Sequence, residues 1–263
     1  MIPIKSEQEI AMMREGGRKL AWVFGKVLAE IKPGAKINEL DELAEKLIKK
    51  QGGKPSFKMV KGYSWATCIN VNQGVVHGIP NDYQLKLDDL VSLDMGIFFK
   101  GFHTDMARTI RVDGREGKFL QVGKAALKKA IEVARPGKRI GHISAVIGKE
   151  IKKAGYSPIR NLTGHGVGKT LHQEPQIPCF SRERISATAL IEPGMTLAIE
   201  VIYAQGKPDL RVTSDDWTVE TADSRPAALF EDTVAIGSKK AEVLTSLPRV
   251  KRRGRHAAFR RDE

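Results

Sequence analysis

The chain has 263 residues, 41% of them hydrophobic, and a formal net charge of +13 at pH 7. This length allows one large core or two small ones, and no apolar run approaches the roughly eighteen residues that span a membrane. The two cysteines, Cys68 and Cys179, are far apart in sequence, which excludes a disulfide framework and a CxxC metal site. A reducing cytoplasm is the simplest location for such a chain.

The first elements are helical. Ser6 and Glu9 form a capping box near the N-terminus, where a signal peptide would instead show a long apolar segment. Apolar residues recur at helical spacing over 6–31, which predicts a long amphipathic helix that ends before Pro33. A second helix is expected to begin at Asn38 as its N-cap and to stop at the two glycines after Gln51.

Strand patterns follow. Residues 56–60 and 65–72 are strand-like, and 90–105 reads as a hairpin whose strands meet at Lys100-Gly101 and are interrupted at Met95-Gly96. Its two strands carry Asp94 and Asp105, which could converge on one point. Two buried carboxylates repel each other unless a cation lies between them, so a metal is one explanation. Two aspartates that merely cap turns are the other.

The chain then repeats itself. Helices are predicted at 118–134 and at about 141–154. When the numbering is shifted by 103 positions, nine of 23 residues in 33–55 are identical to those in 136–158. Both segments begin with Pro-Gly, and in both a glycine near the end is followed three residues later by a proline. This agreement indicates two similar halves.

The similarity extends to polar motifs. His77-Gly-Ile-Pro80 resembles His172-Gln-Glu-Pro175, and the strand that ends at Asp94 resembles the strand that ends at Glu200. We therefore expect one α+β domain over residues 1–247, with an antiparallel sheet and a cleft at a pseudo-twofold axis. Each half would contribute a histidine and strand-borne acids to that cleft.

Residues 248–263 form a separate basic tail. They hold seven Lys or Arg and two acids, a net +5 that leaves the rest of the chain at about +8. Such a tail is typically a solvated, disordered end. The alternative is an arm that contacts ribosomal RNA, whose binding would weaken steeply with salt.

Four strand acids and one histidine form a candidate ligand set: Asp94, Asp105, Glu200, Glu231 and His165. Glycines on both sides of His165 leave room around its ring. These oxygen-rich ligands suit Mn²⁺, Fe²⁺ or Co²⁺ better than a structural Zn²⁺, although a catalytic Zn²⁺ would also be tolerated. Four carboxylates carry more charge than one divalent ion needs, so the sequence predicts two divalent ions bridged by shared carboxylates.

Several motifs together resemble the type I methionine aminopeptidases over residues 1–245, in both order and spacing: His77-Gly-Ile-Pro80, Asp94, Asp105, Gly164-His165-Gly166, His172-Gln-Glu-Pro175, Pro193–Glu200, Asp216-Trp217-Thr218 and Phe230–Thr233. The resemblance implies the pseudo-symmetric pita-bread fold, an antiparallel sheet covered by helices. It also implies that Asp94 binds one metal ion, that Asp105 and Glu231 bridge two, and that His165 and Glu200 complete the other.

The same resemblance implies a mechanism. The substrate would be the N-terminal methionine of nascent proteins and peptides with a small second residue, and the reaction would be hydrolysis of the first peptide bond. Glu200 would transfer the proton. His172 would stabilise the developing oxyanion, and His77 would hydrogen-bond the scissile amide or the leaving amine.

Family positions that line the methionine pocket correspond here to Phe57, Tyr63, Cys68, Leu171 and Trp217. Taken one at a time, a residue of each of these types is more often ordinary core than pocket. Three residues depart from the family pattern. Val201 replaces the usual proline after Glu200, which predicts an altered local turn, Asp232 replaces a common histidine, and Leu171 replaces a frequent aromatic, which predicts a wider pocket.

Two alternatives remain open. An X-Pro aminopeptidase or prolidase would share the fold and the ligands, but those enzymes usually carry an additional N-terminal domain. A non-catalytic ribosome-associated protein of this fold would typically have lost ligands. The expected partners are nascent N-termini and, through the basic tail, the ribosome. Neither a membrane nor DNA is expected, and the fold suggests a monomer.

Overall fold

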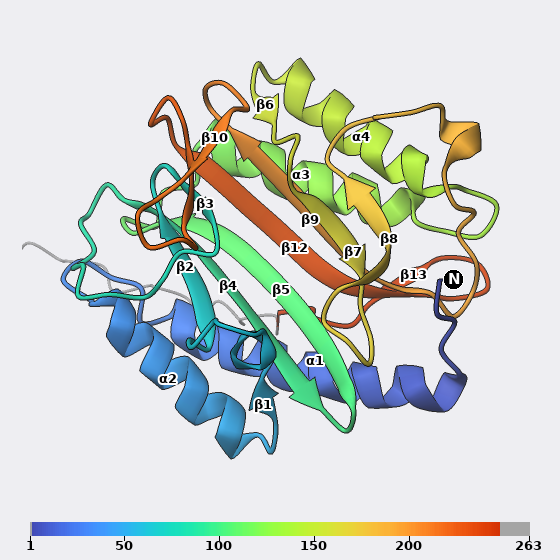
Figure 1. Ribbon diagram of the computed structural model, residues 1–263, viewed down its shortest axis with the longest axis horizontal. Coiled ribbons are helices and arrows are strands. Elements are labelled where there is room, and N and C mark those ends of the chain that lie inside the picture. Colours follow the sequence, from blue (N-terminus) through green and yellow to red (C-terminus); the bar gives the residue numbers. More distant parts are fainter. Residues whose placement is uncertain (1, 248–263) are drawn as a thin grey trace, which may run out of the picture.

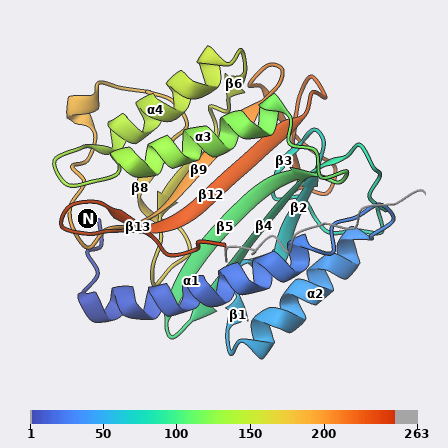
Figure 2. The same cartoon turned by 180° about the vertical axis from the view of Figure 1, so that it is seen from behind.

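Four helices lie against one face of a curved sheet, as Figure 2 shows from behind. The computed structural model describes residues 2–247, so the tail at 248–263 lies outside the described part of the chain. The helices are α1 (Glu7–Leu28), α2 (Ile37–Lys50), α3 (Lys118–Val133) and α4 (Ile140–Lys153). The capping box at Ser6 is present. The Asn38 cap is wrong, because α2 begins after Lys36 and the Asn38 side chain accepts from the next amide instead.

In the described part of the chain, no α-helix covers the opposite face of the sheet (Figure 1). Every strand pair in it is antiparallel, and its main path runs β1-β4-β5-β12-β9-β7-β8. Three further strands join this sheet, and three form a small second one. The strands of the main path are β1 (Lys54–Pro55), β4 (Leu90–Phe99), β5 (Phe102–Arg111), β12 (Ala227–Ile236), β9 (Thr196–Ala204), β7 (Thr163–Gly166) and β8 (Gln173–Pro178). The others are β2 (Thr67–Val71), β6 (Ser157–Pro158) and β13 (Ala241–Val243) in the main sheet, and β3 (Gly74–Val76), β10 (Leu210–Val212) and β11 (Val219–Thr221) in the second.

The predicted hairpin is β4 and β5. Lys100 and Gly101 form its turn with positive φ angles of 49° and 88°, the conformation that two-residue hairpin loops require. The predicted interruption at Met95-Gly96 is wrong, because β4 runs through it without a break. The strand expected at 56–60 is also wrong. A 3₁₀ turn, η1 (Phe57–Met59), occupies most of it, and a second 3₁₀ turn is η2 (Ile185–Ala187).

The internal repeat is present in the coordinates. α2 and α4 begin and end at equivalent positions of the two repeats, and so do β1 and β6. Pro55 in β1 pairs with Ile97 in β4, while Pro158 in β6 pairs with Tyr203 in β9. These pairings make Asp94 and Glu200 equivalent positions of the two halves.

The apolar core forms two large clusters, one for each half. One cluster packs α1 and α2 against β4 and includes Phe24, Ile48 and Leu93. The other packs α3 and α4 against β9 and β12 and includes Ile147 and Tyr203. Both clusters pack against the helical side of the sheet, so the middle of the other side is free to carry polar side chains. Among the described residues, no helix is both long enough and apolar enough to cross a bilayer.

Candidate metal centre

A row of acids crosses the middle of the sheet on its helix-free side. Asp94 in β4 lies opposite Ala107 in β5, Ala107 lies opposite Glu231 in β12, and Glu231 lies opposite Glu200 in β9. Residues directly opposite each other in an antiparallel pair share a face, as do residues two apart in a strand. Asp105, two residues from Ala107, therefore joins the same face. Like charges directly opposite each other are destabilising, which makes this row costly without a cation.

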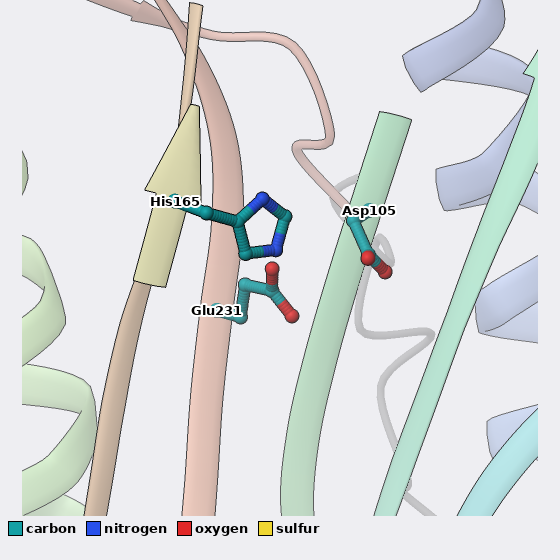
Figure 3. A group of neighbouring side chains, drawn as sticks. All are labelled: Asp105, His165 and Glu231. Carbon is teal, nitrogen blue, oxygen red and sulfur yellow. The ribbon is translucent and has the colours of Figure 1, made fainter. Parts of the chain in front are cut away.

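His165 faces this row from β7. The ligand atoms of Asp105, His165 and Glu231 lie within 4.8 Å of one another, and Figure 3 shows the three side chains converging from their separate strands. The His165 Nε2 atom is 3.6 Å from Glu200 Oε1. Its Nδ1–H donates to the Gly166 carbonyl at 2.9 Å, because that oxygen can only accept. This hydrogen bond leaves Nε2 with a free lone pair toward the acids.

Burial shifts the pKa of every group in this cluster. It raises the pKa of Asp105 to about 7. Burial, followed by repulsion from Asp105, raises the pKa of Asp94, Glu200 and Glu231 well above the usual carboxyl range. Burial lowers the pKa of His165 to about 4, so the ring is neutral near pH 7, as a metal ligand must be.

Three carboxylate oxygens in this cluster are buried without any hydrogen-bond partner: Asp94 Oδ1, Asp105 Oδ1 and Glu231 Oε1. Buried polar atoms are normally satisfied, so each of them requires an explanation. A divalent cation supplies one, since hard oxygen donors and a neutral imidazole are its preferred ligands. The residues present therefore fit a metal centre.

One cavity joins the acids to an apolar wall. All twelve residues that the sequence assigned to the site line this cavity, five as metal ligands, two as further catalytic histidines and five as pocket residues. His77 lines the cavity and has a backbone φ of +58°, which is uncommon for a residue other than glycine. Its ring lies 6.4 Å from that of Trp217, and the His172 ring lies 4.6 Å from that of His165.

The apolar wall is a small cluster of its own, apart from the two main cores. Phe57, Tyr63, Cys68 and Leu171 are buried in it, and Trp217 packs against it. The Tyr63 ring stacks edge-on against Trp217 at 5.0 Å, and its hydroxyl donates to the Thr67 carbonyl at 2.8 Å. This apolar wall therefore lies in the same cavity as the acids.

Comparison with known proteins agrees with this geometry. The model of metallopeptidase family M24 matches residues 11–238. Methionine aminopeptidase 1 of Bacillus subtilis is 38% identical over 248 residues, which cover 93% of this chain and 99% of that protein. The chain belongs to the methionine aminopeptidases of family M24.

Solved structures agree with this assignment. The crystal structure of the methionine aminopeptidase from Thermotoga maritima matches with a TM-score of 0.89 at 37% identity, covering 93% of this chain and 99% of that one. The prolidase from Pyrococcus furiosus matches less closely, with a TM-score of 0.75 at 25% identity, and only 66% of it is covered. The predicted pita-bread fold is thereby confirmed, and the prolidases are more distant relatives of this aminopeptidase. As a member of a metallopeptidase family, it binds divalent metal.

The structure adds residues that the sequence did not assign. Val60 and Val76 also line the cavity. Val76 is the last residue of β3 and directly precedes His77, so its position next to a predicted catalytic histidine was a signal that could have assigned it to the site. The altered turn predicted at Val201 is wrong, because β9 runs straight through that residue and buries it. Asp232 faces away from the acids and pairs with Arg108.

Proposed function

We propose that this aminopeptidase removes methionine from the N-terminus of nascent proteins and peptides by hydrolysing the first peptide bond. The observation that carries the proposal is the single cavity in which five candidate ligands, two further histidines and an apolar pocket meet. The acids supply a hydrolytic centre, and the pocket beside them supplies a place for the methionine side chain. Membership of the methionine aminopeptidases supports both parts.

We further propose that two divalent ions bind, with Asp94 on one, Asp105 and Glu231 bridging both, and His165 and Glu200 on the other. The excess of carboxylates over what one ion needs and the three unpartnered oxygens support two ions. When bound, such ions lower the pKa of a coordinated water toward about 7 and polarise the scissile carbonyl. Mn²⁺, Fe²⁺, Co²⁺ and Zn²⁺ are all compatible with these ligands.

Glu200 is the proposed proton carrier. Its carboxylate would accept a proton from the attacking water and deliver it to the leaving amine, a transfer worth about 10²–10⁴-fold in rate. Its place in the row beside Glu231 supports this role, because both the water and the leaving group must lie above that row.

His172 and His77 are the proposed hydrogen-bond donors to the substrate. Partial desolvation in the cavity lowers the pKa of both rings below the usual histidine value, so each is mostly neutral near pH 7 and can donate from one nitrogen. His172 would donate to the developing oxyanion, and His77 to the scissile amide or the leaving amine. The substrate's free α-amine would lie on the Asp94 side, which restricts the enzyme to chain ends.

The apolar wall is the proposed methionine pocket, formed by Phe57, Tyr63, Cys68, Leu171 and Trp217. An unbranched thioether fills such an irregular aromatic pocket well. A narrow mouth would confine the second residue of the substrate to Gly, Ala, Ser, Thr, Cys, Pro or Val.

A peptide series tests the reaction. Met-Ala-Ser should be hydrolysed to free methionine, while Ala-Pro peptides should be left intact. Release of residues only where proline follows would refute the proposal in favour of a prolidase. Glu200→Gln should lower kcat by about 10²–10⁴-fold. Metal analysis of protein purified without added metal would identify the ions and give their number per chain.

The remaining partner is the ribosome, which we propose is contacted by the basic tail at 248–263, outside the described residues. Deletion of the tail should reduce co-sedimentation with ribosomes and flatten its salt dependence, with peptide turnover unchanged. Unchanged co-sedimentation would refute this role. We also propose that the enzyme acts as a monomer in the cytoplasm, in keeping with its free cysteines, and sedimentation and cell fractionation would test these two points.

A further inference from the structure

The two halves of the sheet meet at a short seam between β5 and β12. Only two residue pairs define its register, Glu231 with Ala107 and Asp232 with Met106. β4 and β5 pair along their whole length, and so do β9 and β12. Asp105 and Glu231 lie on opposite sides of this short seam, so their relative position depends on it.

Threonine side chains hold the two ends of the seam. Thr233 Oγ1 accepts from the Asp105 amide and donates to the Asp105 carbonyl, both at 2.8 Å. At the other end, Thr109 Oγ1 accepts from the Leu229 amide at 2.8 Å and donates to the Leu229 carbonyl at 2.9 Å. Both threonines lie on the same side of the sheet as the acids.

Arg108 holds the seam from the helical side. Its Nη1 donates to the Ala107 carbonyl at 2.8 Å and also to the Glu231 carbonyl, so one nitrogen bonds both strands. Its Nη2 donates to both carboxylate oxygens of Asp232 at 2.8 Å. The Thr245 hydroxyl donates to Asp232 Oδ1 at 2.9 Å and fixes the carboxylate. The Arg108 and Asp232 side chains are only 16% and 8% exposed.

A buried ion pair is costly to assemble, and breaking one by removing a single partner is costlier still. This pair contributes nothing to the cavity, because both side chains lie on the opposite side of the sheet from the acids. Its hydrogen bonds instead converge on the backbone of Glu231 and on the residue that follows it. The planar fork of an arginine can make all of these bonds at once, whereas a lysine ammonium cannot.

We propose that Arg108 and Asp232 are positioning residues for the proposed reaction, and that they hold Asp105 and Glu231 at the separation needed to share metal ions. This inference rests on the proposed metal-bridging role of those two acids. Partners that orient metal ligands without touching the metal typically change metal affinity by about 10–100-fold when they are removed. The same acids held at a different separation would still bind metal, but less tightly.

Calorimetric titration of the metal-free protein with Mn²⁺ tests the proposal. Arg108→Gln and Asp232→Asn should each weaken Mn²⁺ binding by about 10–100-fold. Arg111→Gln is the matched control, since Arg111 also lies on β5 and forms ion pairs with Asp88 and Asp113, but on a more exposed part of the strand. It should bind Mn²⁺ as the wild type does. Wild-type Mn²⁺ affinity in folded Arg108→Gln and Asp232→Asn would overturn the proposal.

A second readout separates positioning from general damage. At saturating Mn²⁺, Arg108→Gln should lower kcat on Met-Ala-Ser while KM stays within about twofold, because no residue of the apolar wall lies on β5 or β12. If Arg108→Gln does not fold, Arg108→Lys keeps the charge without the fork and should still bind Mn²⁺ more weakly. Wild-type affinity in Arg108→Lys would also overturn the proposal. An inactive wild-type enzyme would refute the proposed function, whereas the ratio of Mn²⁺ affinities would still test the seam.

Discussion

The two halves of the molecule share a backbone plan and differ in what they place on it. Asp94 and Glu200 occupy equivalent positions on β4 and β9, and each faces the same cavity. The neighbouring strands differ. Asn70 pairs with Ser92 in the first half, and His165 pairs with Ala198 at the equivalent place in the second. Asn70 Oδ1 accepts from the Gly78 amide at 2.9 Å and supports the His77 loop, while His165 faces the acids.

The connections between the paired strands differ as well. A two-residue turn joins β4 to β5, whereas residues 205–226 join β9 to β12 and form β10 and β11 on the way. β11 pairs with β3 of the first half, which brings Trp217 against Tyr63. The repeated and the non-repeated parts of the fold therefore contribute different residues to the cavity. The repeated strands carry the acids, and the departures from the repeat supply His165 and one wall of the cavity.

The largest expected effect concerns the acids that the two halves contribute to one centre. Asp105→Ala and Glu231→Ala should each reduce kcat/KM on Met-Ala-Ser by about 10³-fold or more, because either change removes a proposed bridging ligand and, with it, electrostatic stabilisation by the metal. Asp88→Asn is the control, since its side chain is 89% exposed. Equal losses for the two variants would support equivalent roles, and wild-type turnover in either would contradict a shared centre.

The next effect tests the longer connection. Trp217→Ala should lower kcat/KM for methionyl peptides by about 10–100-fold, through loss of apolar contact with the methionine side chain, and should leave metal content unchanged. Val212→Ala lies on the same connection but is 61% exposed, so it should behave as wild type. Wild-type kinetics in Trp217→Ala would mean that this connection does not form part of the methionine pocket.

The third prediction concerns the different roles of Asn70 and His165, which occupy equivalent positions in the two halves. Asn70→Ala should lower the free energy of unfolding by about 1–3 kcal/mol, because it leaves the buried Gly78 amide without its acceptor, and metal binding should remain. His165→Ala should instead lose metal affinity. Urea denaturation and metal titration of both variants would measure the difference. The same outcome for both would mean that the two positions do not differ in role.

The smallest effect concerns the acids from both halves together. In metal-free protein burial raises the folded-state pKa of Asp105 to about 7 and raises those of Asp94, Glu200 and Glu231 well above the usual carboxyl range, whereas unfolded carboxyls titrate near pH 4. Between pH 7 and 8 the folded state therefore holds protons that the unfolded state has lost. Its stability should fall as pH rises, by about 0.4 kcal/mol between pH 7 and 8 for the Asp105 carboxyl alone.

Denaturation of the metal-free enzyme at pH 7 and pH 8 checks this sign. The histidines contribute little in this window, because burial lowers the pKa of His165 to about 4 and an unfolded histidine titrates near 6.5. The matched sample is the metal-saturated enzyme, in which bound cations replace the protons and the loss should disappear. Rising stability of the metal-free enzyme over this interval would contradict the buried carboxyl cluster.

Local pattern was sufficient for much of this protein. Helical periodicity located α1 to α4 to within a few residues, because each helix buries one stripe and its ends carry glycine and proline signals. The repeat around Pro33 and Pro136 predicted two halves, and the order of the motifs identified the family. The same motifs named twelve of the residues that line the cavity, and the roles assigned to them stay predictions.

Pairing across the sheet was decided only by the tertiary structure. The row from Asp94 to Glu200 depends on the register of four strands. The hairpin turn fixes β4 against β5, but β12 and β9 lie far from them in the sequence, and nothing local to these strands determines that Glu231 lies opposite Ala107 and Glu200. For the same reason the partner of Asp232 could not be read from the sequence. Arg108 lies on a strand from the other half, and the two residues come together only because the halves close at one seam.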